Sequence, residues 1–70
     1  MTETDAKNLK EGEVLKCKNT YLNCFFKDQT YYIFRIEDCL GDVMFTLQHN
    51  GHVVNWHLKI FELLLWFEKL

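Results

Sequence analysis

Seventy residues supply a single domain, because a chain of this length must use most of its apolar side chains in one small core. Apolar residues make up 49% of the chain and aromatic residues 16%, a share high enough that part of it is expected on the surface as an interface. The formal net charge is −2 and the lysines and arginine are scattered, which argues against nucleic acid as the partner.

The first residues carry little pattern, and the first strand follows them. Residues 1–8 are polar and without periodicity, so we expect a flexible N-terminal arm, with a single β-barrel domain over residues 9–70. From residue 13 to residue 18, Leu15 and Cys17 alternate with lysines, which is typical of a half-buried strand.

The middle of the chain predicts a long loop followed by the central strand. Residues 19–28 mix polar side chains with aromatic ones and are expected to form a long loop or an irregular hairpin. Residues 30–37 are rich in β-branched and aromatic side chains, which favour strands. Alternation places one set of side chains on one face of this strand, namely Tyr32, Phe34 and Ile36, and another set on the opposite face, namely Tyr31, Ile33 and Arg35.

Asn50-Gly51 lies between two alternating apolar runs and is the strongest short-range signal in the chain. Such a pair predicts a two-residue β-hairpin turn, which sets His49 directly opposite His52. Residues 38–42 contain Gly41 and predict the turn that leads into this hairpin.

The C-terminal run from His57 to Leu70 is compatible with one helix or with a short helix followed by a last strand, and the second arrangement fits its charged residues better. A helix from about Leu58 to Leu63 would bury Phe61 and expose Lys59 and Glu62, and the strand would run from Leu64 or Leu65 to Lys69. The apolar stretch is interrupted by charges and too short to span a bilayer, so no membrane partner is expected.

This order of elements predicts a mainly β fold, a small SH3-like barrel of about five strands with one short C-terminal helix. Several segments resemble small phage-encoded proteins of this kind. The resembling segments are Gly12 to Cys17 (G-x-V-x-x-C), Phe26 with Tyr32 and Phe34, the Gly41-Asp42 turn, and Trp56 to Phe61 (W-x-L-x-x-F). The resemblance covers about residues 9–68 and implies a virus-encoded accessory protein in the cytoplasm of the infected bacterial host, a class in which binding and inhibiting host proteins is common.

The leading functional hypothesis is therefore a protein-binding module that inhibits or redirects a bacterial host protein, in host takeover or anti-defence. We expect exposed aromatic residues and an acidic turn to bind the partner, namely Phe25, Tyr31, Glu37, Asp38 and Asp42. Two alternatives stay open: a small nucleic-acid-binding barrel that stacks bases on its aromatic residues, and a homodimeric structural protein joined through the C-terminal apolar segment.

Neither catalysis nor a cofactor is expected. Nothing in the sequence ties Cys17, Cys24 or Cys39 to a histidine base, and their spacing matches neither a zinc site nor a disulfide framework. His49 and His52 could chelate a divalent ion across the hairpin, but no spacing supplies a third ligand, so we interpret them as polar residues of a hairpin tip.

Overall fold

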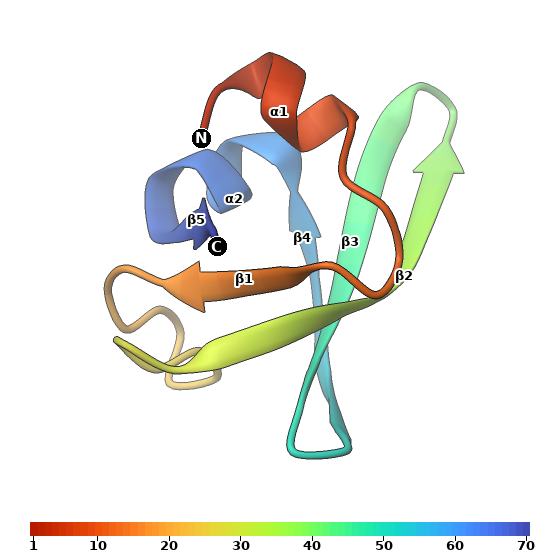
Figure 1. The fold of residues 1–70 in the computed structure, drawn as a ribbon. Helices are drawn as coiled ribbons and strands as arrows, with labels where there is room; N and C mark the ends of the chain where they lie inside the picture. The colour runs from red at the N-terminus through yellow and green to blue at the C-terminus, as the bar shows by residue number, and fades with distance from the viewer.

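Five antiparallel strands form one sheet in the order β4-β3-β2-β1-β5, and two short helices lie beside it. The structure, a computed structural model, describes all residues 1–70. Figure 1 shows its elements, which are α1 (Glu3–Lys7), β1 (Val14–Cys17), β2 (Thr30–Cys39), β3 (Asp42–His49), β4 (His52–Lys59), α2 (Ile60–Trp66) and β5 (Phe67–Lys69). The predicted mainly β class with five strands is confirmed, while strand pairing does not join β4 to β5 and so does not close the sheet into a barrel.

Strand β2 is the longest element and spans the molecule. Its first residues, 30–32, pair with β1, and residues 32–39 pair with β3, as Figure 1 shows. A bulge between Ile33 and Arg35 interrupts the ladder at Phe34. The extra residue shifts the alternation, so that Ile33 and Ile36 both pack toward the core although they are an odd number of residues apart.

Both hairpin turns are two residues long, as predicted for residues 50–51. Asn50 and Gly51 have φ of 51° and 79°, and Leu40 and Gly41 in the β2–β3 turn have φ of 52° and 89°. Positive φ at both central positions defines the type I′ turn, whose twist matches that of the strands it joins. The register is as predicted, with His49 opposite His52.

Gly51→Val should destabilise the protein by about 1 kcal/mol or more, because a β-branched side chain is strained at positive φ. Urea unfolding measures this cost. The matched control is Asn50→Gly, which fits the left-handed conformation in the same turn and should leave the unfolding midpoint nearly unchanged. Equal midpoints for the Gly51→Val variant and the parent chain would contradict the turn geometry.

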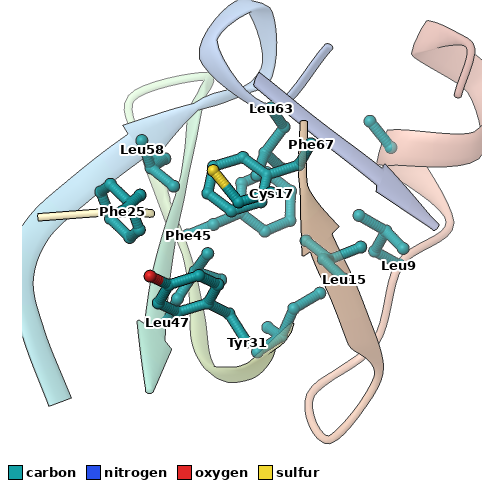
Figure 2. Packing of buried hydrophobic residues seen from close by; sticks show 12 residues of the cluster. Leu9, Leu15, Cys17, Phe25, Tyr31, Phe45, Leu47, Leu58, Leu63 and Phe67 are labelled. Carbon is teal, nitrogen blue, oxygen red and sulfur yellow. The ribbon is translucent and has the colours of Figure 1, made fainter. Parts of the chain in front are cut away.

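The core lies between the inner face of the sheet and the two helices (Figure 2). It contains twelve buried apolar residues, which are Ala6, Leu9, Leu15, Cys17, Phe25, Tyr31, Ile33, Phe45, Leu47, Leu58, Leu63 and Phe67. All three cysteines are free thiols, with Cys17 buried and Cys24 and Cys39 exposed.

The predicted lack of structure in residues 1–8 is wrong, because these residues form α1. A capping box between Thr2 and Asp5 satisfies amide groups at the helix start. Ala6 is fully buried, Met1 packs against the core, and α1 contacts α2. A five-residue helix held by one buried alanine is too short to show periodicity in the sequence.

The C-terminal helix and strand are confirmed in type, with different bounds and a different buried side. Strand β4 continues to Lys59, so His57 lies in a strand instead of starting a helix. Within α2 the expected exposure is reversed, since Phe61 is 59% exposed and Glu62 is buried. The reason is that the Glu62 carboxylate has hydrogen-bond donors on three sides, described below, and these offset the cost of its burial.

Candidate protein interface

The candidate site is the outer face of the β2-β3-β4 meander, opposite the core. Residues paired directly across neighbouring strands point to the same face, so the register identifies the side chains that share it. The rows across the outer face are Tyr32, Gln48 and Val53, then Arg35, Thr46 and His57, then Glu37, Met44 and Lys59, and finally Cys39 and Asp42.

One end of the outer face is apolar. Tyr32 and Phe34 are each 48% exposed on β2, and Val53 is exposed on β4 at the level of Tyr32. On the neighbouring strand β1, the half-buried Val14 lies directly opposite Tyr32. Exposed aromatic side chains grouped in this way mark interaction surfaces, because tyrosine and phenylalanine contribute large contact areas at interfaces.

The opposite end of the outer face is hollowed and carries charge. A cavity of about 340 Å³ lies over neighbouring residues of β2, β3 and β4. It is lined by Glu37, Cys39, Asp42, Met44, His57 and Lys59. A second cavity of about 330 Å³ continues toward the helices, lined by Glu3, Gly41, Asp42, Val43, Lys59, Ile60, Phe61 and Leu64. Asp42 and Lys59 line both cavities, so the two adjoin near the end of the β2–β3 hairpin, and together they are called the groove here.

The charges in this groove are incompletely paired. Glu37 lies 3.7 Å from Arg35, and Glu3 lies 3.4 Å from Lys7, in both cases between exposed side chains. The Asp42 carboxylate and the Lys59 ammonium take part in no ion pair of the structure. Exposed pairs contribute little to stability, so the carboxylates remain free to meet a charged group from outside.

Three of the five predicted interface residues are exposed or half-buried near this groove. Glu37 and Asp42 line it, and Asp38 lies exposed at its end. The Asp38 carboxylate also accepts a hydrogen bond of 3.2 Å from the Gly41 amide, so this side chain has a structural role in the turn. Glu37 and Asp38 lie within β2 and not in the turn itself.

The predicted exposure of Tyr31 is wrong, since its side chain is 1% exposed. Tyr31 pairs with Leu15 of β1, and this pairing places its ring on the core side together with Leu15. The hydroxyl oxygen accepts a hydrogen bond of 2.8 Å from the amide of Phe26, which satisfies the buried polar group. The exposed aromatic residues of β2 are therefore its sequence neighbours Tyr32 and Phe34.

The predicted exposure of Phe25 is also wrong, and its neighbour Phe26 is exposed instead. Phe25 is fully buried and Phe26 is 50% exposed. Tyr21 and Phe25 form an isolated antiparallel bridge around a turn at Leu22 and Asn23, which have positive φ. This small hairpin directs the Phe25 ring into the core, where it meets Tyr31 and Phe67 edge to face.

Glu62 is a buried carboxylate that the sequence did not identify. Its Oε2 accepts hydrogen bonds from the Tyr21 hydroxyl at 2.6 Å and the Trp56 Nε1–H at 3.2 Å, and its Oε1 accepts from the Lys59 amide at 2.9 Å. Burial alone raises the pKa of this carboxyl group, but the three hydrogen bonds outweigh it and the pKa lies below its ordinary value. The carboxylate thus joins the loop after β1, β4 and α2.

Two of the three histidines, His49 and His57, make side-chain hydrogen bonds within the fold. His49 Nδ1–H donates to the Thr30 carbonyl at 2.8 Å, and His49 Nε2 accepts from the Asn50 side chain at 3.2 Å. His57 Nδ1 lies 2.7 Å from the Thr46 hydroxyl. No three His, Cys, Asp or Glu side chains are grouped closely enough to hold a metal ion.

Comparisons with known proteins do not assign this chain to a family. No family model matches the chain, and neither the curated proteins nor the solved structures include a significant match. Neither helix is long and apolar enough to cross a membrane.

Proposed function

We propose that this protein is a protein-binding module whose outer face on β2, β3 and β4 docks against a partner protein. The observation that carries the proposal is the exposure of Tyr32 and Phe34 at one end of the outer face, with a charged cavity at the other end of the same face. A central aromatic contact with a polar rim is the usual anatomy of a protein interface.

The partner proposed from the resemblance in the sequence is a bacterial host protein. On this proposal the chain is phage-encoded, acts in the cytoplasm of the infected bacterium, and inhibits or redirects its target by occupying a surface of it. The exposed carboxylates of Glu37, Asp38 and Asp42 would speed association with a basic surface through electrostatic steering. Neither a catalytic step nor a cofactor is part of the proposal.

A second candidate, a homodimer, is favoured by apolar exposure at the C-terminal end. Phe61, Leu65 and Leu70 are all more than half exposed. Light scattering distinguishes this candidate by the mass of the particle. A nucleic-acid-binding function is disfavoured, because the outer face balances Arg35 and Lys59 with Glu37 and Asp42 and so lacks the basic character that phosphates require.

The double variant Tyr32→Ser, Phe34→Ser should lose the partner that the parent chain captures from a bacterial lysate. Both side chains are half-exposed, so their replacement removes contact area for a partner while the core stays intact. Captured proteins would be quantified by mass spectrometry against the parent chain. The control is Phe26→Ser, which removes an equally exposed aromatic ring outside the outer face and should retain the partner.

Retention of the same partner by the double variant would contradict the proposed docking face. Retention combined with a dimeric parent chain that becomes monomeric in the Phe61→Ser variant would instead favour the homodimer. A salt-sensitive mobility shift with single-stranded nucleic acid, abolished in the double variant, would favour the nucleic-acid-binding alternative.

A further inference from the structure

We propose that the groove shared by the two cavities binds an extended peptide segment of the partner, one that presents a basic side chain next to a large apolar side chain. This inference rests on the proposed function, because it names the chemistry of the partner at one end of the outer face. The groove is defined by the residues that line the two cavities given above, with Asp42 and Lys59 at their junction.

The apolar side chain would occupy the cavity next to α2. Its wall is formed by Val43 of β3 and by Ile60, Phe61 and Leu64 of α2. Phe61 is 59% exposed at the first turn of the helix, although its ring borders a concave space. The cavity volume of about 330 Å³ lies at the lower end of the range of ligand sites, about 300 to 1,000 Å³, and suits one large side chain.

The basic side chain would be held by the carboxylates at the other end. Glu37 and Asp42 line the cavity on the outer face, and Glu3 lines its continuation, against the single cation of Lys59. Asp42 has no ion-pair partner to give up, and Glu37 has only the exposed Arg35. A guanidinium group would pair with a free carboxylate in a bidentate manner, so arginine fits better than lysine.

The backbone of an extended peptide would supply hydrogen-bond acceptors for Lys59. Its ammonium group has donors and no acceptor and makes no ion pair, and Lys59 is one of the two residues that line both cavities. A peptide that crosses this junction offers carbonyl oxygens to it. A phosphate ligand would meet three carboxylates in the same groove, so charge complementarity favours a basic peptide over a nucleic acid.

Synthetic peptides test this inference directly. The probe is an acetylated and amidated Gly-Ser-Arg-Leu-Ser-Gly peptide, titrated into the full chain and followed by calorimetry and by amide chemical shifts. Two comparison peptides carry glutamate in place of arginine, or serine in place of leucine. We expect the glutamate peptide to bind at least about tenfold more weakly, because like charges meet in the groove.

Matched variants locate the binding. Asp42→Asn and Phe61→Ala should each weaken binding of the Arg-Leu peptide by about threefold to tenfold, the first through lost charge and the second through lost contact. The controls are Asp28→Asn and Phe26→Ala, which change an exposed carboxylate and an exposed ring outside the groove and should bind as the parent does. The effect of Asp42→Asn should shrink at high salt.

Equal affinity for the arginine and glutamate peptides, or parental affinity in the Asp42→Asn variant, would overturn the inference, as would no binding of any peptide. The same experiments distinguish a failure of this inference from a failure of the proposed function. If lysate capture depends on Tyr32 and Phe34 but not on Asp42, the docking face stands and the groove proposal falls. If the peptide binds as expected while the double variant keeps its partner, the groove stands and the outer aromatic pair is not the docking site.

Discussion

Tyr31→Ala should destabilise the fold by about 3–5 kcal/mol, the usual cost of truncating a large buried aromatic side chain. The ring lies 5.4 Å from that of Phe25 and 5.9 Å from that of Phe67, both edge to face, and 5.0 Å from the ring of His49. Its removal would open a cavity in the cluster shown in Figure 2 and leave the Phe26 amide without its acceptor. For so small a domain this loss approaches the whole stability.

The matched control is Tyr32→Ala, which removes a chemically identical side chain one residue away. Because Tyr32 is half-exposed on the outer face, its replacement should cost less than about 1 kcal/mol. Tyr31→Phe separates packing from the hydrogen bond, since only the hydroxyl group is lost. Urea unfolding of the three variants gives the ranking, and equal losses for Tyr31→Ala and Tyr32→Ala would contradict the buried position of Tyr31.

The choice between Tyr31 and Tyr32 shows what local patterns leave open in this chain. Alternation along residues 30–37 correctly separates the two faces at the start of β2, but it does not say which face is inward. That decision comes from pairing with β1, where Leu15 faces Tyr31. Both faces of β2 carry apolar side chains, so composition could not decide between them.

Turn chemistry was more informative because it acts within a few residues. Asn50-Gly51 and Gly41 specified two hairpins, since glycine at positive φ carries no steric cost. The bulge at Phe34 and the burial of Glu62 depend instead on side chains far away in sequence. No pattern near residue 62 indicates that Tyr21 will donate a hydrogen bond to it.

The candidate interface was predicted only in part for the same reason. The acidic residues Glu37 and Asp42 were identified by sequence because strand ends next to a turn are exposed in almost any packing. Their union with Phe61 and Lys59 in one groove requires α2 to approach the β2–β3 hairpin, which only the tertiary structure shows.

Glu62→Ala should cost about 2–3 kcal/mol, because it leaves three donors without their acceptor in a partly buried site. These donors are the Tyr21 hydroxyl, the Trp56 indole and the Lys59 amide. Glu62→Gln keeps one side-chain oxygen and should cost less, since its amide group can still accept on one side. Tyr21→Phe in both backgrounds completes a double-mutant cycle, in which additive losses would contradict a direct interaction between Tyr21 and Glu62.

The charge of Glu62 predicts how this cost varies with pH. Its folded-state pKa lies below the ordinary value of 4.5, so as the pH falls the unfolded chain takes up the proton first. The stabilisation from the Glu62 carboxylate is therefore fully present above about pH 4.5 and is lost as the pH falls through the folded-state pKa. Glutamine does not titrate, so the difference in unfolding free energy between the parent chain and Glu62→Gln should be constant near neutral pH and shrink toward about pH 3. The low-pKa carboxylate of Asp5 is common to both chains and cancels in this difference. A difference that stayed constant from neutral pH to about pH 3 would show that the hydrogen bonds to Glu62 do not favour its ionised form.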